Sequence, residues 1–160
     1  MAAEQSVTQI MTTDVLAIAP ETPIGQVARI MSDNGISGLP VVDANNNLVG
    51  IITETDIVSH EIQIDTPTFV PFLDWIIRMP GDTSEDDIRR VLATSAAELM
   101  TSPVYSVTVD ATVREVATLM FERKVNPVPV LNHLDQVVGI VSRSDIVRLL
   151  AEVDAPLSAS

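Results

Sequence analysis

The stretch LVGIITETDIVSHE at residues 48–61 returns as VVGIVSRSDIVRLL at residues 137–150. Each copy has a glycine, two apolar residues, a Thr or Ser, and an Asp three positions after that hydroxyl residue. The two aspartates, Asp56 and Asp145, are 145 − 56 = 89 positions apart. A pattern of this length that occurs twice in one chain indicates an internal repeat, and the repeat organises the rest of the sequence.

The repeat extends well beyond the two quoted stretches. An offset of 89 aligns residues 10–58 with residues 99–147 without a gap, and 14 of the 49 pairs are identical. Two copies are too few for a solenoid, so we expect a pseudo-symmetric pair in which each copy covers the other's apolar face. The identical pairs include Met11/Met100, Thr12/Thr101, Val15/Val104, Ala28/Ala117, Pro40/Pro129, Val41/Val130, Gly50/Gly139 and Ile57/Ile146.

Each copy has the pattern of a β-α-β-β-α unit, which predicts a mixed α/β (α+β) fold. The helix of the first copy follows from apolar residues that recur every three or four positions. We expect Thr22 as its N-cap, Pro23 at its first position and Gly35 as its stop. The last helix of each copy is expected to open at Thr53 or Ser142. The expected strands are 15–19, 39–42 and 48–52 in the first copy and 104–109, 128–131 and 137–141 in the second.

The repeat also predicts the domain boundaries. The first unit covers residues 1–60, a helical insert 61–96, the second unit 97–150 and a tail 151–160. The insert carries an apolar stripe at helical spacing, which is typical either of a core helix or of a protein-contact surface. The stripe consists of Phe69, Phe72, Trp75, Ile76 and Met79.

Charge and composition exclude several classes of function. The net charge of −13 makes nucleic acid and anionic membranes poor partners, because phosphate binding needs clustered Lys and Arg. Cysteine is absent, which excludes disulfides and thiolate metal sites. The start of the chain lacks a signal-peptide pattern, and no apolar run approaches the roughly 20 residues that span a bilayer. We therefore expect a soluble cytoplasmic protein.

The sequence shows no machinery for catalysis. No nucleophile–base pair, phosphate-binding P-loop or GxGxxG motif is present. His60 and His133 stand alone, without a His or carboxylate at metal-ligand spacing. We expect no catalytic residue and no metal site, so catalysis is the weakest functional hypothesis for this chain.

The twin motif suits a nucleotide. Gly50 and Gly139 let a ligand or another chain segment approach the backbone closely. The start of a helix favours a phosphate, through unpaired N–H groups and a partial positive charge. An Asp one turn later can accept two hydrogen bonds from a ribose diol. The competing interpretation is structural, because Thr or Ser followed by Asp three residues later is also an ordinary helix start.

The whole pattern resembles a tandem pair of CBS domains, known as a Bateman module. The matching motifs are IMTTDVLAI and LMTSPVYSV, GLPVVD and PVPVLN, and GIITETDI and GIVSRSDI. The resemblance implies two units packed sheet to sheet, with adenosine-containing ligands in clefts between them. Such ligands are AMP, ADP, ATP, S-adenosylmethionine, NADH and cyclic dinucleotides. It also implies a homodimer or a higher homo-oligomer.

The resemblance further implies the binding residues. Ribose would bind Asp56 or Asp145, and the base would pack beside the residues at the start of the strands of each unit. In the first copy the nucleotide-binding residues are Thr13, Val15, Ile36, Gly38, Pro40, Thr53, Thr55 and Asp56. In the second they are Ser102, Val104, Val125, Pro127, Pro129, Ser142, Arg143, Ser144 and Asp145.

Charge favours the second copy for phosphate. Arg143 stands where the first copy has Glu54, and Arg123 and Lys124 lie nearby in the sequence. The first hypothesis is therefore a regulatory sensor of adenine nucleotides, AMP before ADP or ATP, that changes its oligomer shape for a partner such as an enzyme acting in trans. The alternative is a ligand-free structural or interaction module that works through the insert.

Overall fold

The computed structural model describes residues 2–63 and 94–154, which form two compact units. One unit contains residues 17–44, 49–63 and 94–103 and is named the β1–β2 unit after strands β1 (Gly38–Val42) and β2 (Leu48–Thr53). The other contains residues 2–16, 45–48 and 104–154 and is named the β4–β5 unit after strands β4 (Val128–Leu131) and β5 (Val137–Val141). The predicted aromatic stripe of the insert, and the end of the tail, lie outside the described residues. No described helix is both long enough and apolar enough to cross a bilayer.

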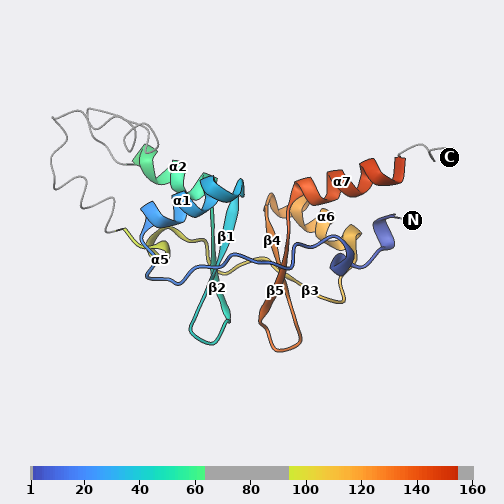
Figure 1. Ribbon diagram of the computed structural model, residues 1–160, viewed down its shortest axis with the longest axis horizontal. Coiled ribbons are helices and arrows are strands. Elements are labelled where there is room, and N and C mark those ends of the chain that lie inside the picture. The colour runs from blue at the N-terminus through green and yellow to red at the C-terminus, as the bar shows by residue number, and fades with distance from the viewer. Residues whose placement is uncertain (1, 64–93, 155–160) are drawn as a thin grey trace. The chain divides into compact units, whose positions relative to one another are not determined.

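The β4–β5 unit has the predicted β-α-β-β-α order of the second copy. Its three-stranded sheet has the order β3-β4-β5, with β3 parallel to β4 and β4 antiparallel to β5. Helices α6 and α7 lie together on one side of this sheet (Figure 1). The elements are β3 (Val107–Thr108), α6 (Val113–Arg123), β4 (Val128–Leu131), β5 (Val137–Val141) and α7 (Arg143–Asp154), preceded by two 3-10 turns, η1 (Ala2–Glu4) and η2 (Val7–Gln9).

A capping box starts α6. The Thr112 hydroxyl accepts a hydrogen bond from the N–H of Glu115 at 3.2 Å, and the Glu115 carboxylate accepts one from the N–H of Thr112 at 2.7 Å. The helix then presents Val116 and Met120 to the sheet, where they join Val7 from η2 in one apolar cluster. Burial of this cluster is the main source of stability of the unit. Its other fully buried side chains are Val128, Val130 and Val141.

The β1–β2 unit is built in the same way around α1 and a two-stranded sheet. Its core contains Val27, Leu39 and Ile52, all with an exposed fraction of 0%. Ala96, the last residue of the predicted insert, is part of the same cluster. The elements are α1 (Ile24–Asn34), β1 (Gly38–Val42), β2 (Leu48–Thr53), α2 (Glu54–Gln63) and α5 (Ala96–Leu99).

Local structure at the start of the first copy differs from two predictions. Pro23, not Thr22, is the N-cap of α1, because Pro23 is still extended at φ −63° and ψ 143°. The Thr22 hydroxyl instead accepts a hydrogen bond from the N–H of Ala19 and closes a turn. The strand expected at 15–19 is reduced to one parallel bridge, between Ile18 and Val41. Gly35 ends α1 as predicted, in the left-handed conformation at φ 61°.

The first residues of each copy pack in the unit that holds the other copy's motif. Thr12 pairs with Ile140 through two backbone hydrogen bonds, and Thr101 pairs with Ile51 in the same way. A Cβ built on Gly139 would lie 2.9 Å from Cγ of Met11, and one built on Gly50 would lie 2.8 Å from Cγ of Met100. Both glycines are therefore required by a methionine from the other copy. Relative to the repeat, the two units therefore exchange the first segment of each copy. Residues 10–16 of the first copy lie in the β4–β5 unit, and residues 99–103 of the second copy lie in the β1–β2 unit.

Candidate functional site

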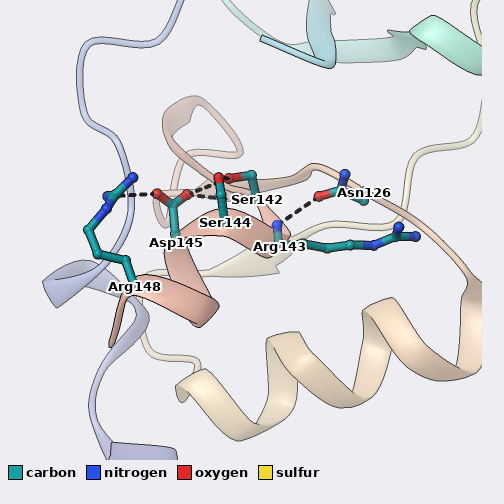
Figure 2. A network of polar contacts seen from close by, with 6 residues as sticks. All are labelled: Asn126, Ser142, Arg143, Ser144, Asp145 and Arg148. Atoms are coloured by element: carbon teal, nitrogen blue, oxygen red, sulfur yellow. Dashed lines mark hydrogen bonds and ion pairs between the residues drawn. The ribbon is translucent and has the colours of Figure 1, made fainter. Parts of the chain in front are cut away.

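Among the residues whose burial the structure describes, Asp145 has the one buried charged side chain, with an exposed fraction of 6%. Its Oδ2 accepts hydrogen bonds from the N–H of Ser142 at 2.8 Å and from the Ser142 hydroxyl at 3.0 Å (Figure 2). The Ser142 and Ser144 hydroxyl oxygens are 2.7 Å apart. The motif therefore forms a compact polar cluster at the first turn of α7, and Oδ2 of Asp145 fixes the start of the helix.

The second oxygen of Asp145 faces a cation. Nη1 of Arg148, one turn further along α7, lies 3.3 Å from Oδ1 of Asp145. The Arg148 side chain is 64% exposed. Arg143 directs its side chain away from the carboxylate, on the opposite side of the cluster from Arg148 (Figure 2). The carboxylate thus has one oxygen committed to the helix start, and within the described part of the chain the other is held by an exposed ion pair alone.

Asp56 makes a different set of contacts at the matching position. Its Oδ2 accepts from the N–H of Thr53 at 2.9 Å and from the Thr53 hydroxyl at 3.1 Å, as in the other copy. Its Oδ1 accepts from the hydroxyl of Thr101 at 3.1 Å, however, and position 59, which matches Arg148, is a serine. Asp56 therefore ties the exchanged segment to α2, so the twin motifs are not equivalent.

The backbone at the helix starts is less available than the sequence suggests. The N–H of Arg143 donates to Oδ1 of Asn126 at 2.9 Å, and the N–H of Ser142 donates to Asp145. The N–H of Glu54 donates to the carbonyl of Ser37 at 3.0 Å. The expectation of several unpaired amides for a phosphate is therefore wrong. At α7, the side chain of Arg143 remains as an exposed donor. The Ser144 hydroxyl already donates to the Ser142 oxygen, because the hydrogen of the Ser142 hydroxyl goes to Asp145.

The structure divides the predicted binding residues between the two units. Thr13 and Val15 lie in the same unit as Asp145, and Ser102 lies in the same unit as Asp56. Each predicted set thus has members in both units, although Val104 stays in the same unit as Asp145. Pro40 and Pro129 are fully buried in the strands, whereas Ser102 and Thr13 are exposed. The β4–β5 unit also holds Val104, Val125, Pro127, Ser142, Arg143 and Ser144, and the β1–β2 unit holds Ile36, Gly38, Thr53 and Thr55.

Three residues of the clusters did not figure among the predicted site residues. Arg148 could have been found, since a basic residue three positions after an acid on a helix is a recognisable pair. Thr101 carried a signal too, as part of the repeated Met-Thr pair. Asn126 gave no signal, because its side chain reaches Arg143 across 17 positions of sequence.

The remaining polar groups do not suggest another centre of chemistry. Nε2 of His133 lies 3.5 Å from Oδ2 of Asp110, and the two side chains are 72% and 73% exposed. Within residues 2–63 and 94–154 no three His, Asp or Glu side chains gather as metal ligands would. The exposed pair of His133 and Asp110 contributes little to stability.

Comparison with known proteins agrees with the repeat. The family model for the CBS domain matches residues 7–62 and 96–152. The chain belongs to the CBS domain family. A CBS domain-containing protein of Dictyostelium discoideum is 29% identical over 151 residues, which cover 94% of each chain. The family assignment thus rests on both copies of the repeat, as the resemblance of the sequence motifs implied.

Solved structures of CBS pairs have the same fold. The CBS domain pair of protein MJ0100, in complex with 5′-methylthioadenosine and S-adenosyl-L-methionine, has a TM-score of 0.71 and 27% identity, covering 93% of this chain and 98% of that one. CBSX2 of Arabidopsis thaliana, in complex with AMP, has a TM-score of 0.70 and 20% identity, with coverage of 93% and 98%. The mixed α/β fold predicted from the sequence is confirmed.

Proposed function

We propose that this CBS pair is a non-catalytic, cytoplasmic regulatory module that binds an adenosine-containing ligand at the Asp145 cluster. AMP is the preferred ligand, followed by ADP and ATP. The observation that carries the proposal is the buried carboxylate of Asp145, whose Oδ1 has the exposed Arg148 as its one partner among residues 2–63 and 94–154. A buried charge is costly unless it is paired, so a ligand that donates to this oxygen can take the place of the exposed arginine.

The chemistry of the cluster fits a ribose with a phosphate attached. The ribose diol can donate to Oδ1 of Asp145, and a phosphate can accept from the Arg143 guanidinium. The Ser144 hydroxyl can donate to the phosphate as well once it turns away from the Ser142 oxygen. Adenosyl ligands are also those named for the MJ0100 pair, which is 27% identical to this chain. Arg143 favours AMP over S-adenosylmethionine, because the latter has no phosphate and carries a positive charge.

The Asp56 cluster is proposed as the weaker of two adenosyl sites. The Thr101 hydroxyl already donates to its Oδ1, and a diol would have to share or displace that bond. Glu54 stands where the second copy has Arg143, and its carboxylate repels a phosphate. Thr53, Thr55 and Asp56 therefore suit an uncharged nucleoside portion better than a nucleotide.

An exposed apolar stripe on α7 supports assembly into a homodimer or a larger homo-oligomer. Val147, Leu150 and Val153 are 64%, 57% and 62% exposed and recur every three residues, which places them along one side of the helix. Exposed apolar groups of this kind mark contact surfaces. We propose that nucleotide binding changes this assembly and that a partner, such as an enzyme acting in trans, responds to the change.

A thermal-shift screen tests the proposal. The ligands are AMP, ADP, ATP, S-adenosylmethionine, 5′-methylthioadenosine, NADH and a cyclic dinucleotide. We expect the largest rise in melting temperature with AMP. A ligand at 100 times its Kd stabilises the folded state by about 2.7 kcal/mol, so binding at millimolar concentration is readily detected. No rise with any ligand at millimolar concentration would favour a ligand-free interaction module. Turnover of a ligand would favour an enzyme instead.

A further inference from the structure

We infer that Arg148 is a specificity-determining residue of the Asp145 site, which competes with the ribose diol for Oδ1 of Asp145. The inference rests on the proposed function and adds a residue that sets the affinity of the Asp145 site for a ribose diol. Arg148 is not a member of the repeated motif, and the matching position of the first copy is Ser59. The competition is thus a property of one site only.

The argument depends on how many hydrogen bonds the carboxylate can accept. Each carboxylate oxygen accepts about two hydrogen bonds. Oδ2 of Asp145 already accepts two, from the N–H and the hydroxyl of Ser142. Oδ1 accepts one, from Nη1 of Arg148, which leaves room for one more. A ligand that donates two hydroxyls to Asp145 must therefore displace Arg148, whereas a ligand that donates one need not.

The Arg148 contact is suited to such an exchange. It is a single bond of 3.3 Å to a side chain that is 64% exposed, so the guanidinium can return to water at little cost. Arg148 also lies on the opposite side of the carboxylate from Arg143 (Figure 2), and so away from the side assigned to the phosphate. Its effect should therefore be on the ribose hydroxyls and not on the phosphate.

The first copy offers a matched control. The Thr101 hydroxyl at Oδ1 of Asp56 belongs to a segment that is fixed by two backbone hydrogen bonds to Ile51. A short side chain on a fixed backbone keeps its hydroxyl near Oδ1 of Asp56. Arg148, in contrast, is held to Asp145 only by its own side chain, so the exchange is available at this site.

The experiment uses uncharged ligands, so that removing a positive charge does not act through a phosphate. Adenosine and 2′-deoxyadenosine are titrated by calorimetry into the wild-type protein and into Arg148→Met, which keeps the stem of the side chain and removes the donor. We expect Arg148→Met to bind adenosine about two- to five-fold more tightly, the range for an exposed ion pair. The affinity for 2′-deoxyadenosine should stay within about 1.5-fold, because one hydroxyl fits beside Arg148.

Two further variants complete the design. Arg148→Lys keeps a cationic donor and should bind adenosine like the wild type. Ser59→Arg places the same residue three positions after Asp56, at the other cluster, and should leave the adenosine affinity of the Asp145 site unchanged. Circular dichroism confirms that each variant is folded.

Three results would overturn the inference. Weaker adenosine binding by Arg148→Met would mean that Arg148 contacts the ligand. An equal change, or no change, for both nucleosides would mean that it does not compete with the diol. If the wild-type protein binds neither adenosine nor AMP, the proposed function fails and the inference fails with it. Binding by the wild type without an effect of Arg148→Met rejects the inference alone.

Discussion

Gly139→Ala should destabilise the protein because it pushes against Met11. The new Cβ would lie 2.9 Å from Cγ and 3.2 Å from Cβ of Met11, closer than carbon atoms pack in proteins. Gly139 has no positive φ, so the backbone itself accepts alanine. Overpacking of this kind costs about 1–3 kcal/mol, since the methionine must leave its position against the core of the β4–β5 unit.

A double-mutant cycle separates this clash from other effects. Met11→Ala alone loses part of a half-buried side chain, but in the Gly139→Ala background it also removes the clash. The double variant should therefore be more stable than the sum of the single changes predicts, by about 1 kcal/mol or more. The measurement is urea unfolding followed by circular dichroism, with Gly139→Ala, Met11→Ala and the double variant compared at equal protein concentration.

Gly35→Ala is the control for this cycle. Its φ of 61° makes alanine strained, while no atom lies within 4 Å of the added Cβ. The cost should be about 1–2 kcal/mol and should add to that of Met11→Ala within about 0.5 kcal/mol. If the effects of Gly139→Ala and Met11→Ala on the free energy of unfolding are also additive, contact with the exchanged methionine does not explain why both copies have a glycine at this position.

Two other substitutions give independent checks. Thr112→Ala removes the hydroxyl of the capping box of α6 and should lower the free energy of unfolding by about 1 kcal/mol, with no effect on nucleotide affinity; a loss of AMP binding would contradict this. Leu150→Glu puts a charge into the exposed stripe of α7 and should shift the protein toward the monomer in light scattering after gel filtration, while the monomer keeps its helical signal; an unchanged mass would exclude this face as the contact.

Much of the fold could be predicted because the second copy follows local rules. Its helix has a capping box and a regular apolar stripe, and two of its strands are short runs rich in Val. The strand expected at 104–109 is shorter, Val107–Thr108. The first copy was harder, since Pro23 and the turn at Thr22 compete for the start of α1. The exchange of first segments could not be predicted from the repeat, because similar copies can pair within a copy or across copies.

The candidate site was predictable to the level of its motif. The spacing of Ser142 and Asp145 indicated a helix start, and the structure shows that Oδ2 of Asp145 has this role. The spacing gave no information on the other oxygen. Its partner depends on residues outside the motif, Arg148 in one unit and Thr101 in the other, and these differ although the motifs match. The asymmetry of the twin clusters is therefore a property of the tertiary structure.

The central claim is that an adenine nucleotide binds at Asp145. Its most direct test is calorimetric titration of AMP into the wild type, Asp145→Asn and Asp56→Asn. Asparagine keeps the shape of the side chain but loses a charge-assisted hydrogen bond worth about 1.5–3 kcal/mol, a factor of about 10 to 150 in affinity.

We predict that Asp145→Asn loses affinity for AMP by this factor while Asp56→Asn binds AMP nearly as well as the wild type. Both variants lose one capping carboxylate, so a general effect on folding would appear equally in the two. If Asp145→Asn keeps its affinity and Asp56→Asn abolishes binding, the assignment of the nucleotide to the Asp145 cluster is wrong.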